Sequence, residues 1–200
     1  MKRVLIACCA LLLMGVAAHG QQLSDADRAK GVKYLEQTRD GVVAAVKGLS
    51  DAQMNYKSGP DRWSIAQVLE HIALAENMIF SNVTGDVMKA GPGAVDRDTA
   101  KIDAAVVSRV PDRSRPAQAP PPLVPTGKWT AQESLKHFLA SRERTIAFLK
   151  STPDLRAHVT DSPMKVPLDA YEWLLFIGAH SERHTKQILE VKADANFPKN

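Results

Sequence analysis

Four long segments of this chain repeat apolar residues at helical spacing, and this pattern constrains the fold more than any other feature of the sequence. In the segment that starts at Ile65, apolar side chains recur every three or four residues, which places them on one face of a helix. Serine, threonine or aspartate precedes each segment at a capping position. The predicted helices cover approximately residues 25–49, 65–89, 131–150 and 170–192. Four apolar stripes are buried together in an all-α four-helix bundle.

The connection between the second and third predicted helices is long and rich in proline. Six of the 12 prolines lie between Pro111 and Pro125, and we expect residues 116–125 to form an extended segment on the surface. A short helix is predicted over residues 99–110, and another helical turn follows Ser50. A long connection fits two parallel neighbours in a bundle better than a tight hairpin does. No strand-like alternation of any length accompanies these helices.

The first 20 residues have the pattern of a cleaved signal peptide. Lys2 and Arg3 precede an apolar run over residues 4–16, and small residues follow at 18 and 20. That run is too short to span a membrane comfortably. Residues 5–8 also resemble a lipid-attachment motif, but the apolar stretch before Cys8 is too short, so we do not expect a lipid there. We expect a secreted or periplasmic protein whose bundle domain covers residues 21–200.

Signal removal changes how the composition is interpreted. The full chain has 26 basic and 22 acidic residues, and cleavage after Gly20 removes Lys2 and Arg3 to leave 24 basic residues. Both cysteines, Cys8 and Cys9, leave as well. The mature chain therefore has no disulfide and no thiol nucleophile, and it lacks the cationic cluster that nucleic-acid binding requires.

Two histidines stand one helical turn apart in the last predicted helix. His180 and His184 follow the same stripe as Trp173, Ile177 and Ile188, so both point toward the core. Histidines at this spacing can share one metal ion. The alternative is a pair of hydrogen-bonded core histidines, and spacing alone leaves both open.

The surrounding residues exclude two known zinc-protease motifs. Ser181 occupies the position where the zincin motif has glutamate, and Arg183 occupies that position in the inverted motif. Spacing therefore gives no reason to name Glu182 as a general base.

A third ligand has to come from another helix, and His71 is the best candidate. It lies at the edge of the apolar stripe of the second helix, three residues after Val68. Taken alone, its position favours a boundary histidine over a metal ligand. We expect His137 to be solvated and His158 to lie in a loop.

Two stretches resemble the DinB-like (DinB/YfiT-like) superfamily. WSIAQVLEHI at 63–72 is similar to its second-helix motif, and DAYEW at 169–173 with HSERHTKQI at 180–188 is similar to its last-helix motif. The order and spacing agree over most of the mature chain. The resemblance implies a four-helix bundle with a divalent metal held by His71, His180 and His184. It also implies a possible homodimer, and an activity such as the thiol-dependent S-transfer of some members.

Three imidazoles and an open position are typical of a catalytic metal site. Zinc is the default ion, and nickel, iron or manganese also accept imidazole. A carboxylate could hold a ring N–H, and Glu70, Glu76 and Glu182 are equal candidates. We expect either a metal-dependent hydrolase or transferase that acts on a small molecule, or a metal- or ligand-binding or interaction bundle without turnover.

Large side chains near these motifs have more than one interpretation. Trp63 and Trp173 are expected in the core at the bundle ends rather than in a pocket wall. Arg39 and Arg142 interrupt apolar stripes. Either could face a pocket anion, but we expect both to extend their charged ends to solvent from the stripe edge.

Overall fold

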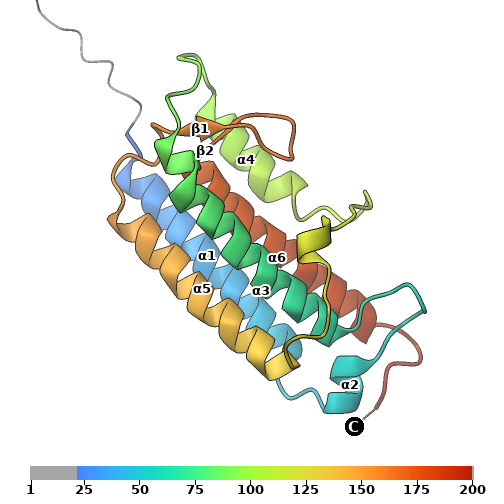
Figure 1. Ribbon diagram of the computed structural model, residues 1–200. Helices are drawn as coiled ribbons and strands as arrows, with labels where there is room; N and C mark the ends of the chain where they lie inside the picture. The colour runs from blue at the N-terminus through green and yellow to red at the C-terminus, as the bar shows by residue number, and fades with distance from the viewer. Residues whose placement is uncertain (1–21, 200) are drawn as a thin grey trace, which may run out of the picture.

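Four long helices packed side by side form the body of the protein. The computed structural model describes residues 22–199 (Figure 1). Each long helix begins after the predicted capping residue, whose side-chain oxygen accepts a backbone N–H. This confirms the all-α four-helix bundle, whereas the predicted signal peptide lies outside the described residues. The bundle helices are α1 (Asp25–Val46), α3 (Ile65–Gly85), α5 (Ala131–Ser151) and α6 (Ala170–Lys192).

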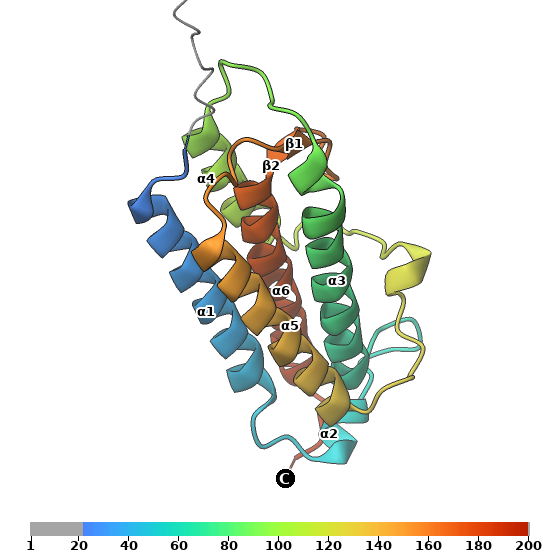
Figure 2. The same cartoon turned by 60° about the vertical axis from the view of Figure 1, so that its left-hand side comes forward.

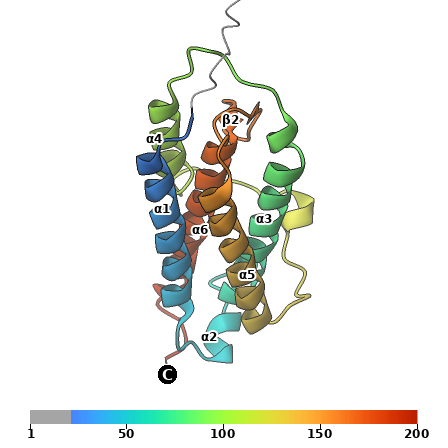
Figure 3. The same cartoon turned by 90° about the vertical axis from the view of Figure 1, so that its left-hand side faces the viewer.

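The helices occupy the corners of the bundle in an order that differs from their order in the chain. Both α1 and α3 pack against α5 and α6, so α1 and α3 lie at opposite corners, as Figure 3 shows. Helices α3 and α5 run in the same direction, while α6 runs opposite to α3 (Figures 1 and 2). The segment 86–130 returns the chain to the end of the bundle where α3 begins, so that α5 starts there too. The predicted pairing of a long connection with parallel neighbours is therefore confirmed.

Shorter elements decorate this connection and the ends of the bundle. The helix predicted to reach residue 89 ends at Gly85, and residues 87–89 form a 3-10 turn that still buries Val87. The predicted short helix is present as α4, which packs against α6. A two-residue antiparallel strand pair covers the start of α6. These elements are α2 (Asp51–Asn55), η1 (Val87–Lys89), α4 (Thr99–Arg109), η2 (Pro121–Leu123), β1 (Val159–Thr160) and β2 (Leu168–Asp169).

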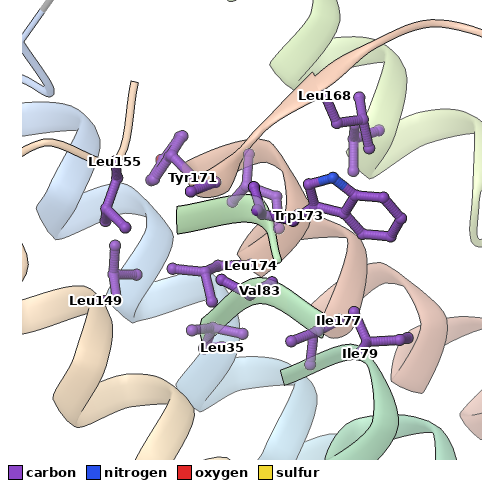
Figure 4. Packing of buried hydrophobic residues seen from close by; sticks show 14 of the residues in the cluster. Leu35, Ile79, Val83, Leu149, Leu155, Leu168, Tyr171, Trp173, Leu174 and Ile177 are labelled. Atoms are coloured by element: carbon purple, nitrogen blue, oxygen red, sulfur yellow. The ribbon is translucent and has the colours of Figure 1, made fainter. Parts of the chain in front are cut away.

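The core lies along the inner faces of the four long helices. Leu35, Leu149, Leu174 and Ile177 come from three of these helices and are at most 1% exposed (Figure 4). Each such side chain stabilises the fold by about 1.5–3 kcal/mol relative to an exposed one. Among residues 22–199, no helix is long and apolar enough to cross a bilayer.

One arginine contradicts the expectation drawn from its stripe. Arg142 does not reach solvent but is fully buried, and Glu76 of α3 accepts two hydrogen bonds from it. A buried cation is tolerated here because a carboxylate and other acceptors surround it. Arg39 is 25% exposed and pairs with Asp40 and Glu143, as expected for a stripe-edge residue.

Candidate metal centre

Three histidines from two helices meet between α3 and α6. His71 comes from α3, and His180 and His184 lie one turn apart on α6. Nε2 of His71 lies 3.2 Å from Nε2 of His180 and 3.1 Å from Nε2 of His184. The structure thus brings together the three histidines that the sequence singled out, and their ligand atoms lie within 4.8 Å of one another.

The outer ring nitrogens of two of these histidines face oxygen acceptors. Nδ1 of His71 lies 2.7 Å from the backbone oxygen of Leu123, and Nδ1 of His184 lies 2.8 Å from Oε1 of Gln187. A carbonyl oxygen can only accept, so each Nδ1 carries the proton. In a neutral imidazole the other nitrogen, Nε2, then presents a lone pair.

The inward-facing nitrogens of His71 and His184 are consequently both acceptors. Two lone pairs 3.1 Å apart repel each other unless a cation or a proton lies between them. Nitrogens bound at about 2.05 Å to a tetrahedral ion lie roughly 3.3 Å apart, close to the separations here. The donor set and its spacing therefore fit a divalent metal ion.

Burial keeps these imidazoles neutral. Loss of solvation is the largest effect on all three rings and lowers the pKa of each. The pKa of His184 falls to about 3 through burial and the nearby His71. A neutral imidazole is the form that coordinates a metal.

None of the three carboxylates considered as partners holds a histidine ring. Glu70 accepts backbone N–H groups from Thr126 and Gly127. Glu76 pairs with the buried Arg142, and Glu182 accepts a hydrogen bond from the Tyr34 hydroxyl. The sequence left these three open as candidates, and none takes the role because each carboxylate has another donor within reach.

Leu123 and Gln187 hold the rings instead, and the sequence analysis missed both. Gln187 lies three residues after His184 on α6, so helical spacing could have identified it. The Leu123 contact uses a backbone oxygen 52 residues away from His71 in the chain. No pattern of residue types reveals such a contact.

A large cavity opens beside the histidines. It has a volume of about 1690 Å³, and α3 and α6 form its floor. Trp63, predicted in the core, is a wall residue whose ring lies 5.0 Å from the ring of His71. Trp173 is only 7% exposed, as predicted for a core residue, and it also borders the cavity.

The proline-rich segment forms the other side of this cavity. Arg183 of α6 anchors the start of the segment by donating to the backbone oxygens of Val110, Asp112 and Arg115. Leu123, near its other end, is buried and faces His71. The segment between these anchors lines the cavity.

The remaining described histidines lie outside the site. His137 is exposed, as predicted, and stacks on Trp129 with ring centroids 4.2 Å apart. His158 lies in the predicted loop, where it contacts the Ala90 oxygen and Asp154. Both serve as controls for the histidine cluster.

Comparison with known proteins gives the family. The chain is 28% identical over 149 residues to the uncharacterized protein YuaE of Bacillus subtilis (strain 168), with 74% of this chain and 88% of YuaE covered. The solved structure of YfiT from Bacillus subtilis, described as a probable metal-dependent hydrolase with an unusual four-helix bundle topology, has a TM-score of 0.54 at 17% identity. That likeness covers 88% of this chain and 91% of YfiT and shows the shared fold. Residues 34–188 match the DinB superfamily, and the chain belongs to this family.

Proposed function

We propose that this protein is an exported, metal-dependent hydrolase of small molecules whose metal ion is held by His71, His180 and His184. One observation carries the proposal: two Nε2 lone pairs, fixed by outer hydrogen bonds, converge 3.1 Å apart beside a large cavity. The description of YfiT as a probable metal-dependent hydrolase supports the reaction class. Zinc is the first candidate, since three imidazoles and an open position are typical of catalytic zinc.

Some residues at this site orient the histidine rings, and others form the cavity beside them. The Leu123 oxygen and the Gln187 amide fix the proton on the outer nitrogens of His71 and His184. Trp63 and the proline-rich segment form walls of the cavity beside the histidines. When bound, the ion supplies Lewis-acid polarisation of a substrate carbonyl and lowers the pKa of a water molecule.

Hydrolysis is favoured over S-transfer by the absence of a thiol. The only cysteines of the chain are Cys8 and Cys9, within the proposed signal peptide. A transferase would therefore need a thiol cosubstrate outside the cytoplasm, whereas hydrolysis needs only water. Intact mass of the protein from its own host tests export, with Gln21 as the expected first residue.

Elemental analysis tests the metal site. We expect about one divalent ion per chain in the wild type and in His137→Ala, and little in His71→Ala. Equal metal content in all three proteins would contradict the ligand assignment.

A screen of metal-loaded protein against esters, amides and epoxides tests turnover. We expect activity that His180→Ala removes and His137→Ala retains. Tight metal binding without turnover of any of these compounds would instead favour a binding protein.

A further inference from the structure

The cavity is larger than a site for one small polar metabolite needs. Ligand pockets typically measure about 300–1,000 Å³, and this one measures about 1690 Å³. Its floor consists of α3 and α6, which run in opposite directions. Residues near the end of α3 therefore lie at the same height along the bundle axis as residues near the start of α6. His71 likewise lies at the same height as His180 and His184.

The part of the cavity near the start of α6 is lined mainly by apolar side chains, and Asn82, Thr160 and Asp161 are its polar members. Met78 and Ile79 of α3 and Trp173 and Phe176 of α6 line it. The rings of Trp173 and Phe176 are 5.6 Å apart. Trp173 precedes His180 by seven residues, which is about 10 Å along a helix. This apolar compartment can therefore hold an aryl group or a medium-length acyl chain.

The part near the end of α6 is charged. Arg62, from the loop before α3, and Gln187 and Glu190 of α6 line it. Arg113 from the proline-rich segment donates two hydrogen bonds to Glu190, at 2.6 and 2.7 Å. The three histidines thus lie at the boundary between an apolar and a charged compartment.

Two arginines that line the charged compartment make no ion pair among residues 22–199, while Asp61, Asp112 and Glu190 line the same cavity. Arg109 precedes the backbone stretch 110–115 that Arg183 holds, Arg115 ends it, and both line the cavity. Among residues 22–199, no carboxylate lies at ion-pair distance from Arg109 or Arg115, and Arg183 donates only to backbone oxygens. An exposed guanidinium of this kind favours a carboxylate or phosphate.

From this geometry we infer that the substrate is an anionic amphiphile. Its apolar group lies against Trp173 and Phe176, its anionic group lies near Arg109 and Arg115, and the bond to be hydrolysed lies beside the histidines. The inference rests on the proposed function for the hydrolysed bond, but the two compartments are observed independently of any metal. Binding can therefore be tested without turnover.

Calorimetric titration of chelator-treated protein with three probes tests this inference. N-octanoylglycine has both an apolar chain and an anionic end, N-acetylglycine lacks the chain, and octyltrimethylammonium carries the opposite charge. We expect N-octanoylglycine to bind at least about tenfold more tightly than either of the others. N-acetylglycine lacks six methylenes that would be buried, and octyltrimethylammonium places a positive charge where the arginines favour a negative one. Equal affinity for N-acetylglycine or for the cation would overturn the inference.

Variants locate the probe in the cavity. We expect Phe176→Asn to weaken the binding of N-octanoylglycine about tenfold. The control is Leu189→Asn, which changes an exposed apolar residue of the same helix outside the cavity and should leave this affinity unchanged. The double change Arg109→Gln and Arg115→Gln should weaken the binding of N-octanoylglycine but not that of the neutral octanamide. Circular dichroism checks the fold of each variant. Wild-type affinity in Phe176→Asn or in the double variant would contradict the assignment.

The outcomes separate this inference from the proposed function. Amphiphile binding without hydrolysis of any ester or amide would support the compartments and contradict the hydrolase. Hydrolysis with the same kcat/KM for acetyl and octanoyl esters would support the hydrolase and contradict the compartments.

Discussion

Two polar clusters lie between α3 and the neighbouring helices, and they differ in whether their buried polar atoms have hydrogen-bond partners within the protein. The first surrounds Arg142, whose five N–H groups are all satisfied. Two donate to Glu76 at 2.7 and 2.8 Å, two donate to the Leu35 oxygen and the Thr38 hydroxyl, and one donates to Ser181. This cluster is complete within the protein.

The histidine cluster is incomplete, because not every ring nitrogen has a complementary hydrogen-bond partner within residues 22–199. The outer nitrogens of His71 and His184 have partners, but among the described residues their inner nitrogens meet only other ring nitrogens. A buried polar cluster that closes on itself holds the fold together, while one whose acceptors converge leaves a place for a ligand. Ser181 lies beside His180 on α6, so the complete cluster also holds the helix that carries the incomplete one.

Breaking the complete cluster should have the largest effect. We expect Arg142→Met to lower the free energy of unfolding by about 3–5 kcal/mol, because it leaves the Glu76 carboxylate buried and unpaired. Urea unfolding measures the change. Arg39→Met is the matched control, since Arg39 is 25% exposed with exposed partners and should cost less than about 1 kcal/mol. Equal costs would show that the Arg142 cluster does not stabilise the fold.

Removing one histidine of the incomplete cluster should lower stability by preventing metal binding, rather than by breaking a contact within the protein. At a zinc concentration of about 100 times Kd, we expect the wild type to gain about 2.7 kcal/mol of stability. His180→Ala should gain almost none at that concentration, because a ligand atom is missing. Thermal unfolding with and without zinc measures the gain, with His137→Ala as the control. A gain in His180→Ala equal to that of the wild type would remove His180 from the site.

Local signals explain how much of this architecture was predictable. The starts of α3, α5 and α6 follow from Ser64, Thr130 and Asp169, whose caps involve residues only three positions away. The pair His180 and His184 follows from one helical turn. The end of α3 was predicted too late because Val87 continues the apolar pattern through a 3-10 turn, and spacing does not separate the two kinds of helix.

Contacts between distant segments explain what was missed. Arg142 looked like a stripe-edge residue because its partner Glu76 lies 66 residues away. The roles of Leu123 and Glu70 depend on how the proline-rich segment crosses α3, which no local pattern specifies. The sequence thus identified the histidines, while the identity of their supporting partners required the fold.

The support of the histidine rings can be tested at Gln187. We expect Gln187→Ala to weaken metal binding about 10–100-fold, because the His184 ring then lacks the acceptor that fixes its proton. Gln187→Glu retains an acceptor and should bind metal within a few-fold of the wild type. Competition with a chromogenic chelator measures both affinities. If Gln187→Ala binds metal as tightly as the wild type, the amide does not orient the ring.

A third cluster, at the start of α6, lies between the two extremes and gives the smallest expected effect. Arg97 and Arg156 face the carboxylates of Asp103, Asp169 and Glu172, so negative charge is in excess. Glu172 Oε2 accepts hydrogen bonds from Arg97 and from the Asp169 N–H, but Oε1 has no hydrogen-bond partner among the described residues. Burial, followed by the charge of Asp169, raises the pKa of Glu172 to about 7.

This raised pKa predicts the sign of a pH effect on stability. Between pH 4.5 and 7 the folded protein holds a proton on Glu172 that the unfolded chain releases, so the stability from this group is complete below pH 4.5 and is lost as pH rises toward 7. We expect Glu172 to contribute a loss of about 1 kcal/mol between pH 5 and 6, close to the limit of 1.36 kcal/mol for one pH unit. Glu172→Gln keeps an acceptor for the Asp169 N–H but cannot titrate, so its unfolding free energy should fall less over that interval. Parallel urea-derived stability profiles for the two proteins would mean that Glu172 is already ionised in the folded state.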